Sequence, residues 1–284
     1  SKQKIREAYR VCFLLLAAKV LNDRKHPYAD NLSSIPAIDI LAKITDFYAL
    51  PFEGVGLPNS ILDGIWRRLN SGISYRHISV EDLAYIYENT LVSPETRKEY
   101  GTHSTPSGVA EFLIGCLKLY EYNLESLKVI EPFCGSATLS VAALKSIRSA
   151  LPRDWSDSAR HDFLVNRLSG SDIDAFALEV AQLSLILADY PNKNGWNIKE
   201  ADLFNSGELS SFIESSSVVI CNPPFEDFNP TERNRYAELA GTSLHKPIAI
   251  LAEVLKAQPT AIGFVMPQGL LSDSYYQEIR KQLA

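Results

Sequence analysis

Cysteine is scarce in this sequence, and the few cysteines present are widely separated. The four residues Cys12, Cys116, Cys134 and Cys221 show no C-x-x-C spacing, and neither a secretory signal nor a histidine cluster accompanies them. This pattern predicts reduced thiols in a cytoplasmic protein, without a zinc site or another bound metal.

Long apolar runs and an excess of basic charge are also missing. The longest apolar candidate, Val11–Leu21, is too short for a membrane span and contains Lys19, so we expect no membrane segment. The net charge is −6 at pH 7, which argues against a protein that binds nucleic acid over its whole surface. A local basic face remains compatible with this charge.

Neither of two glycine-rich phosphate-binding patterns occurs. The absence of G-x-G-x-x-G and of G-x-x-x-x-G-K-[ST] argues against a nicotinamide cofactor or a nucleoside triphosphate. Gly54-Val55-Gly56 begins like such a loop, but no strand precedes it and the third glycine is missing.

Apolar residues are plentiful, at 46% of 284 residues, and predict a substantial core. Apolar positions recur at helical spacing in the first third of the chain, at Lys2–Leu21, Pro36–Tyr48, Pro58–Leu69 and Val80–Leu91. We therefore expect an all-α amino-terminal domain of residues 1–95 and a second domain of residues 96–284. Because the chain starts at Ser1 and Ala284 lies within a helical pattern, it looks like a piece of a longer protein.

The second domain alternates strands with helices, which predicts an α/β fold with a doubly wound, Rossmann-like parallel sheet. Five strands are expected, at Leu127–Ile130, Val165–Asp172, Trp196–Glu200, Val218–Cys221 and Ala261–Met266. Helices are expected at Ala175–Leu187, at Ser243–Lys256 and from Leu270 to the end, with polar connections at Arg153–Arg160 and Glu226–Tyr236. The second connection has the profile of a mobile loop over a site.

The fourth expected strand leads into the candidate site. Proline cannot continue a central ladder, so the apolar run Val218–Cys221 must end before Asn222-Pro223-Pro224-Phe225. In open α/β sheets, ligands bind at this carboxyl end. An amide, two rigid prolines and an aromatic ring can hold a planar amine there, although a plain strand-ending turn would use the same residues.

Adenine is a planar group of this kind. The lone pair of its exocyclic amine is drawn into the ring, so the nitrogen is a poor nucleophile until acceptors hold its hydrogens. The Asn222 side-chain oxygen and the Pro223 carbonyl can accept these hydrogens, and Phe225 can stack on the base.

Three other strand ends carry acidic residues. The turn after the first strand is made of small residues that let the backbone approach a ligand, and Glu131 at the strand tip can meet an ammonium group. Asp172 ends the second strand, where a ribose diol is expected. Asp202 follows the third strand and can accept from an adenine amine, although a lone aspartate there is usually a turn former.

Thr105-Pro106 precedes an apolar helix. The expected arrangement has Thr105 as the N-cap and Pro106 in the first turn. The helix start also exposes N–H groups that can meet a ligand carboxylate.

In this order, the motifs resemble those of the class I S-adenosylmethionine-dependent methyltransferases. Within that class they look like the adenine-N6 DNA methyltransferases of restriction-modification systems, either modification subunits or fused enzymes. The resemblance covers the chain from about Val80 and rests on Thr105-Pro106, E-P-F-C-G-S-A-T at Glu131–Thr138, Asp172, A-D-L-F at Ala201–Phe204, N-P-P-F at Asn222–Phe225 and F-V-M-P-Q-G-L-L at Phe264–Leu271.

The resemblance implies a role for each matching residue. The catalytic set would be Asn222, Pro223, Pro224 and Phe225. S-adenosylmethionine would be bound by Thr105, Pro106, Glu131, Pro132, Cys134, Gly135, Ser136, Asp172, Ile173, Asp202 and Leu203. The target adenine would be flipped out of a DNA duplex, with Phe225 as its stacking platform. The last strands of the sheet would be missing, and DNA would be recognised through a domain or specificity subunit absent from this chain, in a restriction-modification or phage-defence system.

Two departures from the family pattern stand out. Ala137 replaces the usual glycine, and its methyl group would crowd the cofactor loop if that position has a positive φ. His103-Ser104 replaces the usual aromatic pair before Thr105. Two other functions stay open. One is a methyltransferase acting on a protein glutamine amide or on RNA, because N-P-P followed by an aromatic residue suits any flat conjugated amine. The other is a non-catalytic scaffold that binds the cofactor, because of Ala137 and the missing strands.

Overall fold

The computed structural model describes residues 2–50, 56–77, 105–213 and 217–283. The chain divides into two compact units, one of Ser1–Glu99 with Leu183–Gly195, and one of Tyr100–Gln182 with Trp196–Ala284. The expected helix Val80–Leu91, the boundary between residues 95 and 96, and His103-Ser104 lie outside the described residues. Across the described ranges, no helix combines the length and apolar character that membrane crossing requires.

The first unit is helical where the structure describes it. Its elements are α1 (Lys2–Asp23), η1 (Pro27–Ala29), η2 (Leu32–Ser34), α2 (Ala37–Phe47) and α3 (Asn59–Asn70). The three α-helices pack on one another through fully buried side chains such as Leu15, Ile40 and Leu62. Three of the expected helices are therefore confirmed.

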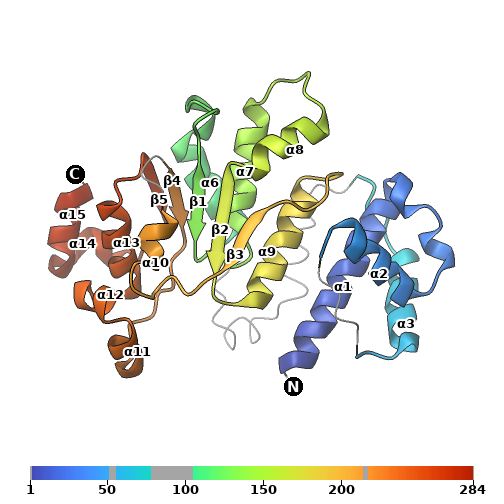
Figure 1. Ribbon diagram of the computed structural model, residues 1–284, viewed down its shortest axis with the longest axis horizontal. Helices are drawn as coiled ribbons and strands as arrows, with labels where there is room; N and C mark the ends of the chain where they lie inside the picture. Colours follow the sequence, from blue (N-terminus) through green and yellow to red (C-terminus); the bar gives the residue numbers. More distant parts are fainter. Residues whose placement is uncertain (1, 51–55, 78–104, 214–216, 284) are drawn as a thin grey trace. The chain divides into compact units, whose positions relative to one another are not determined.

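The second unit contains a parallel sheet in the order β3-β2-β1-β4-β5 (Figure 1). The strands are β1 (Val129–Pro132), β2 (Leu168–Asp172), β3 (Asn197–Glu200), β4 (Val218–Cys221) and β5 (Ala261–Phe264). From β1 the chain moves outward to β3 and then returns to β4 on the other side of β1. The two neighbours β1 and β4 are therefore the switch point of a doubly wound sheet, and every residue of both is buried.

Helices cover both faces of this sheet. The helices described from Ser107 onward are α6 (Ser107–Leu117), α7 (Thr138–Ala150), α8 (Asp157–Val165), α9 (Ala175–Ala188), α10 (Glu208–Phe212), α11 (Pro230–Arg235), α12 (Ala237–Thr242), α13 (Lys246–Lys256), α14 (Gly269–Ser272) and α15 (Gln277–Leu283), with η4 (Leu119–Glu121) and η5 (Ser274–Tyr276). Helix α6 approaches β5 so closely that a Cβ on Gly263 would lie 2.8 Å from Leu117 Cδ1. Val219 and Cys221 of β4 pack on the opposite face, with Leu209 of α10 and Ile250 of α13.

Several expected elements differ from the observed ones. The Arg153–Arg160 connection contains the start of α8, whose N-cap Ser156 accepts a hydrogen bond from the Ala159 amide (3.1 Å). Strand β2 consequently begins at Leu168 rather than Val165. Helix α10 was not expected, α13 begins at Lys246 rather than Ser243, and the expected final helix is divided into α14, η5 and α15. Apolar periodicity is a weak signal for elements as short as α10 and α14.

Candidate active site

The candidate residues gather at one edge of the sheet because all five strands are parallel and in register. Pro132 pairs with Ser171, Asp172 with Glu200, and Cys221 with Phe264. At the switch point, the Cys221 thiol donates to the Pro132 carbonyl oxygen at 3.4 Å. The ends of β1 and β4 are therefore joined by a side chain as well as by the ladder.

Glu131, in β1, is almost completely buried and caps helix α7. Its Oε2 accepts from the Ser140 amide at 2.9 Å and from the Ser140 hydroxyl. Ser140 is the third residue of α7, so the carboxylate faces the helix end where unpaired N–H groups favour an anion. Burial nevertheless raises the pKa of Glu131 to about 8. A cationic ligand group would favour the charged form.

The loop after β1 is fastened to the end of β2. The Cys134 amide donates to the Ser171 carbonyl (2.8 Å), and the Gly135 amide donates to Asp172 Oδ2 (2.9 Å). Asp172 Oδ1 accepts from the Asp174 amide (3.0 Å). Asp172 thus holds the loop in place, and burial raises the pKa of its carboxyl group.

Ala137 has the backbone conformation that makes the departure from glycine matter. Its φ is +60° and its ψ is +32°, its side chain is fully buried, and it occupies the N-cap position of α7. The left-handed conformation costs an L-residue roughly 1–2 kcal/mol. The positive φ considered from the sequence is therefore present.

We expect Ala137→Gly to raise the stability of the protein. Relief of the strained φ outweighs the roughly 0.4–1 kcal/mol that glycine costs through the unfolded chain, so the net gain is at most about 1 kcal/mol. The midpoint of thermal unfolding should therefore shift upward by at most about 2–4 °C. The matched control is Ala143→Gly, which changes a buried alanine inside α7 and should lower the midpoint. A lower midpoint for Ala137→Gly would show that its methyl contributes more packing than strain.

Thr105 and Asn222 are brought together although 117 positions separate them. Asn222 Nδ2 donates to Thr105 Oγ1 at 3.0 Å, and Thr105 is 6% exposed. The other end of the amide, Oδ1, is buried and accepts no hydrogen bond from any described residue. The expected capping role of Thr105 is wrong: Pro106 is the N-cap of α6, and no side chain of a described residue makes a capping hydrogen bond there. The hydroxyl instead faces the amide of N-P-P-F.

The other motif residues differ in how they can contribute. Phe225 is 38% exposed, as a stacking platform requires. Ile173 is exposed as well, and Pro224, Gly135 and Ser136 are half-buried. Four others, Pro132, Cys134, Leu203 and Pro223, are buried, so their backbone groups are better placed than their side chains to line a site.

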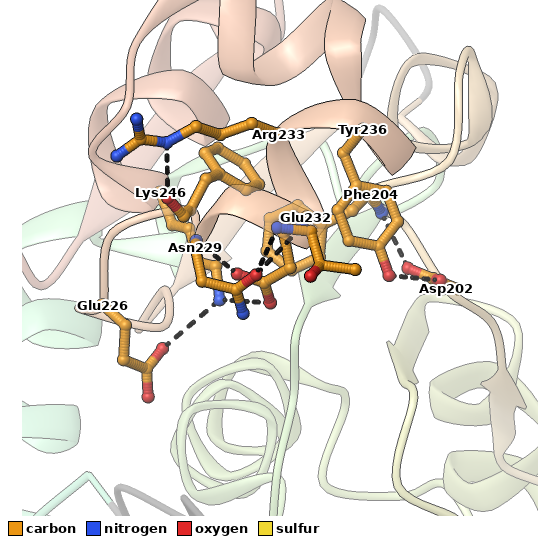
Figure 2. Close-up of polar contacts among 10 residues, drawn as sticks. Asp202, Phe204, Glu226, Asn229, Glu232, Arg233, Tyr236 and Lys246 are labelled. Carbon is orange, nitrogen blue, oxygen red and sulfur yellow. Dashed lines mark hydrogen bonds and ion pairs between the residues drawn. The ribbon is translucent and has the colours of Figure 1, made fainter.

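Asp202 is held by the segment that follows N-P-P-F (Figure 2). Its Oδ2 accepts from Arg235 Nη2 and from the Tyr236 hydroxyl, both at 2.9 Å. Its Oδ1 accepts from the Phe204 amide at 3.2 Å. The sequence pattern did not single out Arg235 or Tyr236 as partners of Asp202, because neither residue belongs to a motif.

The segment Glu226–Lys246, predicted as a loop in its first half, contains α11 and α12. Asn229 caps α11 in a capping box with Glu232, and its Oδ1 accepts from the Glu232 amide (2.9 Å). Buried Lys246 donates to Glu232 Oε1 at 3.0 Å and lies 5.5 Å from the Phe204 ring centre (Figure 2). The N-x-x-E spacing was the available sequence signal for this helix.

Comparison with known proteins decides the family. The model of the family "N-6 DNA Methylase" matches residues 79–284. The chain belongs to this family. The expected resemblance is confirmed, and class I S-adenosylmethionine-dependent methyltransferases share the fold. No curated protein matches the sequence significantly.

Solved structures similar to this N-6 DNA methylase have low sequence identity to it. A protein of Vibrio vulnificus described as a modification subunit of a type I restriction enzyme is 15% identical, with a TM-score of 0.61 over 99% of this chain and 69% of that one. A protein of Listeria monocytogenes assigned to the class I S-adenosylmethionine-dependent methyltransferases is also 15% identical, with a TM-score of 0.56 over 99% and 79%. DrdV, solved with DNA, is 14% identical, with a TM-score of 0.58 over 98% of this chain and 32% of its own.

S-adenosylmethionine is the cofactor of such enzymes, and the strand ends of this chain fit it chemically. Glu131 is a buried acidic group suited to an ammonium ion, and Asp172 and Asp202 are acceptors for hydroxyl and amine hydrogens. Gly135, with φ +52°, has no atom within 4 Å of the position a Cβ would take, so the loop leaves space there. Among the described residues, no group of histidine, cysteine and acidic side chains forms a candidate metal site.

Proposed function

We propose that the intact protein is a site-specific DNA methyltransferase that transfers a methyl group from S-adenosylmethionine to the N6 amine of a flipped adenine. The observation that carries this proposal is the Asn222 amide, whose buried Oδ1 has no donor among the described residues. An unpaired buried acceptor costs about 1–3 kcal/mol, which an incoming amine would offset. Membership of the N-6 DNA methylase family supports the same reaction.

The cofactor would supply an electrophilic methyl group on a sulfonium. Glu131 would hold its ammonium, Asp172 its ribose hydroxyls and Asp202 its adenine amine, with Thr105 and the loop from Pro132 to Ser136 around them. These contacts would keep the methyl group within reach of the end of β4, where productive geometry contributes much of the rate.

At the end of β4, the residues of this chain would act on the target base. Asn222 Oδ1 and the Pro223 carbonyl would accept the two amine hydrogens, which makes the nitrogen more nucleophilic. Pro224 would keep the turn rigid, and the exposed ring of Phe225 would stack on the flipped adenine. After methyl transfer, the surplus proton on the nitrogen would leave to solvent.

DNA recognition would involve parts outside this chain. The chain spans 32% of DrdV and 69% of the Vibrio vulnificus protein. We therefore infer a recognition domain or specificity subunit, as in a restriction-modification or phage-defence system in the cytoplasm.

The test is to incubate the intact protein with labelled S-adenosylmethionine and unmethylated DNA. Nuclease digestion and chromatography should locate the label in N6-methyladenine. Label on a glutamine amide or on RNA, supplied in parallel reactions, would replace this proposal by one of the alternative substrates. Tight cofactor binding without any transferred label would identify a non-catalytic scaffold.

Tyr236 and Arg235 give a separate prediction about cofactor affinity. Both donate to Asp202 Oδ2, so Oδ1 keeps an acceptor site beside the Phe204 amide. We therefore expect Tyr236→Phe and Arg235→Gln to weaken cofactor binding about fivefold each, the loss from one hydrogen bond of roughly 1 kcal/mol. Calorimetry measures this, with Tyr120→Phe at an exposed tyrosine as control. Tighter binding would show that these side chains compete with the cofactor.

A further inference from the structure

Thr105 is the one described residue whose side chain contacts the Asn222 amide through a hydrogen bond. An asparagine amide has a donor end and an acceptor end, and only the acceptor end can hold the hydrogens of an amine. In the structure the donor end, Nδ2, faces Thr105, and the acceptor end is left for another group. Orientation of this amide therefore decides whether the proposed site can work.

A threonine hydroxyl can both donate and accept one hydrogen bond, so Thr105 alone does not select an orientation. One orientation of the Asn222 amide is selected if the Thr105 hydroxyl hydrogen is already donated to another group. None of the described residues accepts that hydrogen from Thr105 Oγ1, and the residue precedes the start of α6, where a ligand carboxylate is favoured. A carboxylate that takes the hydrogen leaves Oγ1 able only to accept.

We propose that Thr105 is a positioning residue that couples cofactor binding to the orientation of Asn222. Its hydroxyl donates to the carboxylate of S-adenosylmethionine and accepts from Asn222 Nδ2, which turns Oδ1 toward the target amine. The proposal rests on the proposed function and deepens it. Without the cofactor, the Thr105 hydroxyl can instead donate its hydrogen to Asn222 Oδ1, and the side-chain amide can rotate to accept it. The Nδ2 hydrogens would then face the target amine, which is also a donor, and no acceptor would hold the amine hydrogens.

The burial of Thr105 and Asn222 strengthens the coupling between cofactor binding and the orientation of the amide. Thr105 is 6% exposed and Asn222 is half-buried, so water competes weakly for either group. Asn222 is also anchored on both sides, by β4 before it and by two prolines after it, so rotation of the side-chain amide is its main remaining freedom. One hydrogen bond is enough to bias a rotation between two orientations.

The experiment compares Thr105→Val with Thr105→Ser in the intact protein. Valine keeps the shape of threonine and removes the hydroxyl, whereas serine keeps the hydroxyl. Duplexes carry either adenine or purine at the methylated position, because purine lacks the exocyclic amine. Binding of each duplex is measured with and without S-adenosylhomocysteine, which retains the carboxylate. Methylation kinetics are measured on the adenine duplex, and Thr242→Val is the control for an exposed threonine.

With S-adenosylhomocysteine bound, we expect Thr105→Val to reduce the preference for adenine over purine about five- to tenfold and to lower kcat by a similar factor. Thr105→Ser should keep both the adenine preference and kcat near their normal values. S-adenosylhomocysteine should strengthen the preference for adenine over purine only in proteins that keep the hydroxyl. If Thr105→Val is unstable, Thr105→Ala serves in its place.

A Thr105→Val protein that keeps the adenine preference and kcat, and shows only a raised KM for the cofactor, would overturn the inference. Such a result would leave Thr105 as a cofactor contact. Failure of the proposed function can be distinguished from failure of the Thr105 proposal, because the unaltered protein would then transfer no methyl group to adenine.

Discussion

Asn222→Ala is expected to reduce methyl transfer to DNA by about 10²–10³-fold, the usual loss when one preorganised polar group is removed from an active site. Alanine removes Oδ1, which has no donor among the described residues and is available for the target amine. Because Asn222 lies at the target side of the proposed site, cofactor affinity should change little. Steady-state methylation and calorimetry measure the two quantities separately.

The control for this variant is Asn234→Ala, which removes an exposed amide from α11 in the same unit. We expect it to retain normal activity. Thermal unfolding of both variants verifies that each is folded. An Asn222→Ala protein that methylates adenine at the normal rate would show that another group activates the amine, and that N-P-P-F merely ends the strand.

Glu131→Gln is expected to have opposite effects on stability and on cofactor binding. Glutamine can still accept from the Ser140 amide and hydroxyl, so the cap on α7 remains. It has no charge to pair with the cofactor ammonium, so affinity should fall about tenfold to a hundredfold, as expected for a charged hydrogen bond. The cofactor-free variant should nevertheless be the more stable protein at alkaline pH.

The pH dependence follows from the direction of the pKa shift. Burial raises the pKa of Glu131 from 4.5 to about 8, so the folded protein retains a proton that the unfolded chain loses. The free energy of unfolding of the cofactor-free protein therefore falls as pH rises from about 4.5 to 8. Above about pH 8 this loss of stability is complete. Glutamine does not titrate, so this contribution should disappear.

Thermal unfolding at pH 5 and pH 9, with and without cofactor, measures both effects. The matched control is Glu125→Gln at an exposed glutamate, which should follow the unaltered protein. If Glu131→Gln has the same pH dependence and the same cofactor affinity as the unaltered protein, Glu131 is a helix cap and not a ligand for the ammonium group.

The sheet and the ends of its strands could be predicted from the types of residue that follow one another in the sequence. Proline cannot join a central ladder, so Pro223 and Pro224 marked the end of β4 in the sequence itself. The buried, β-branched run before them identified a central parallel strand, and β4 is such a strand. Because parallel strands end at one edge, placing Glu131, Asp172 and Asp202 together required only the strand order.

The partners of these residues were not predictable, because they come from distant parts of the chain. The contact between Thr105 and Asn222 spans 117 positions, and the contacts of Asp202 with Arg235 and Tyr236 span 33 and 34. Thr105 fits the pattern of an N-cap by sequence, yet Pro106 takes that position. Local preference was overridden here by a tertiary hydrogen bond.

We propose that the carboxyl ends of β1 to β4 form a methyl-transfer site. A crystal structure of the intact protein with S-adenosylmethionine tests it most directly. We expect the ammonium at Glu131, the ribose at Asp172, the adenine amine at Asp202 and the methyl group facing Asn222. A cofactor bound elsewhere, or with its methyl group turned away from Asn222, would contradict the claim.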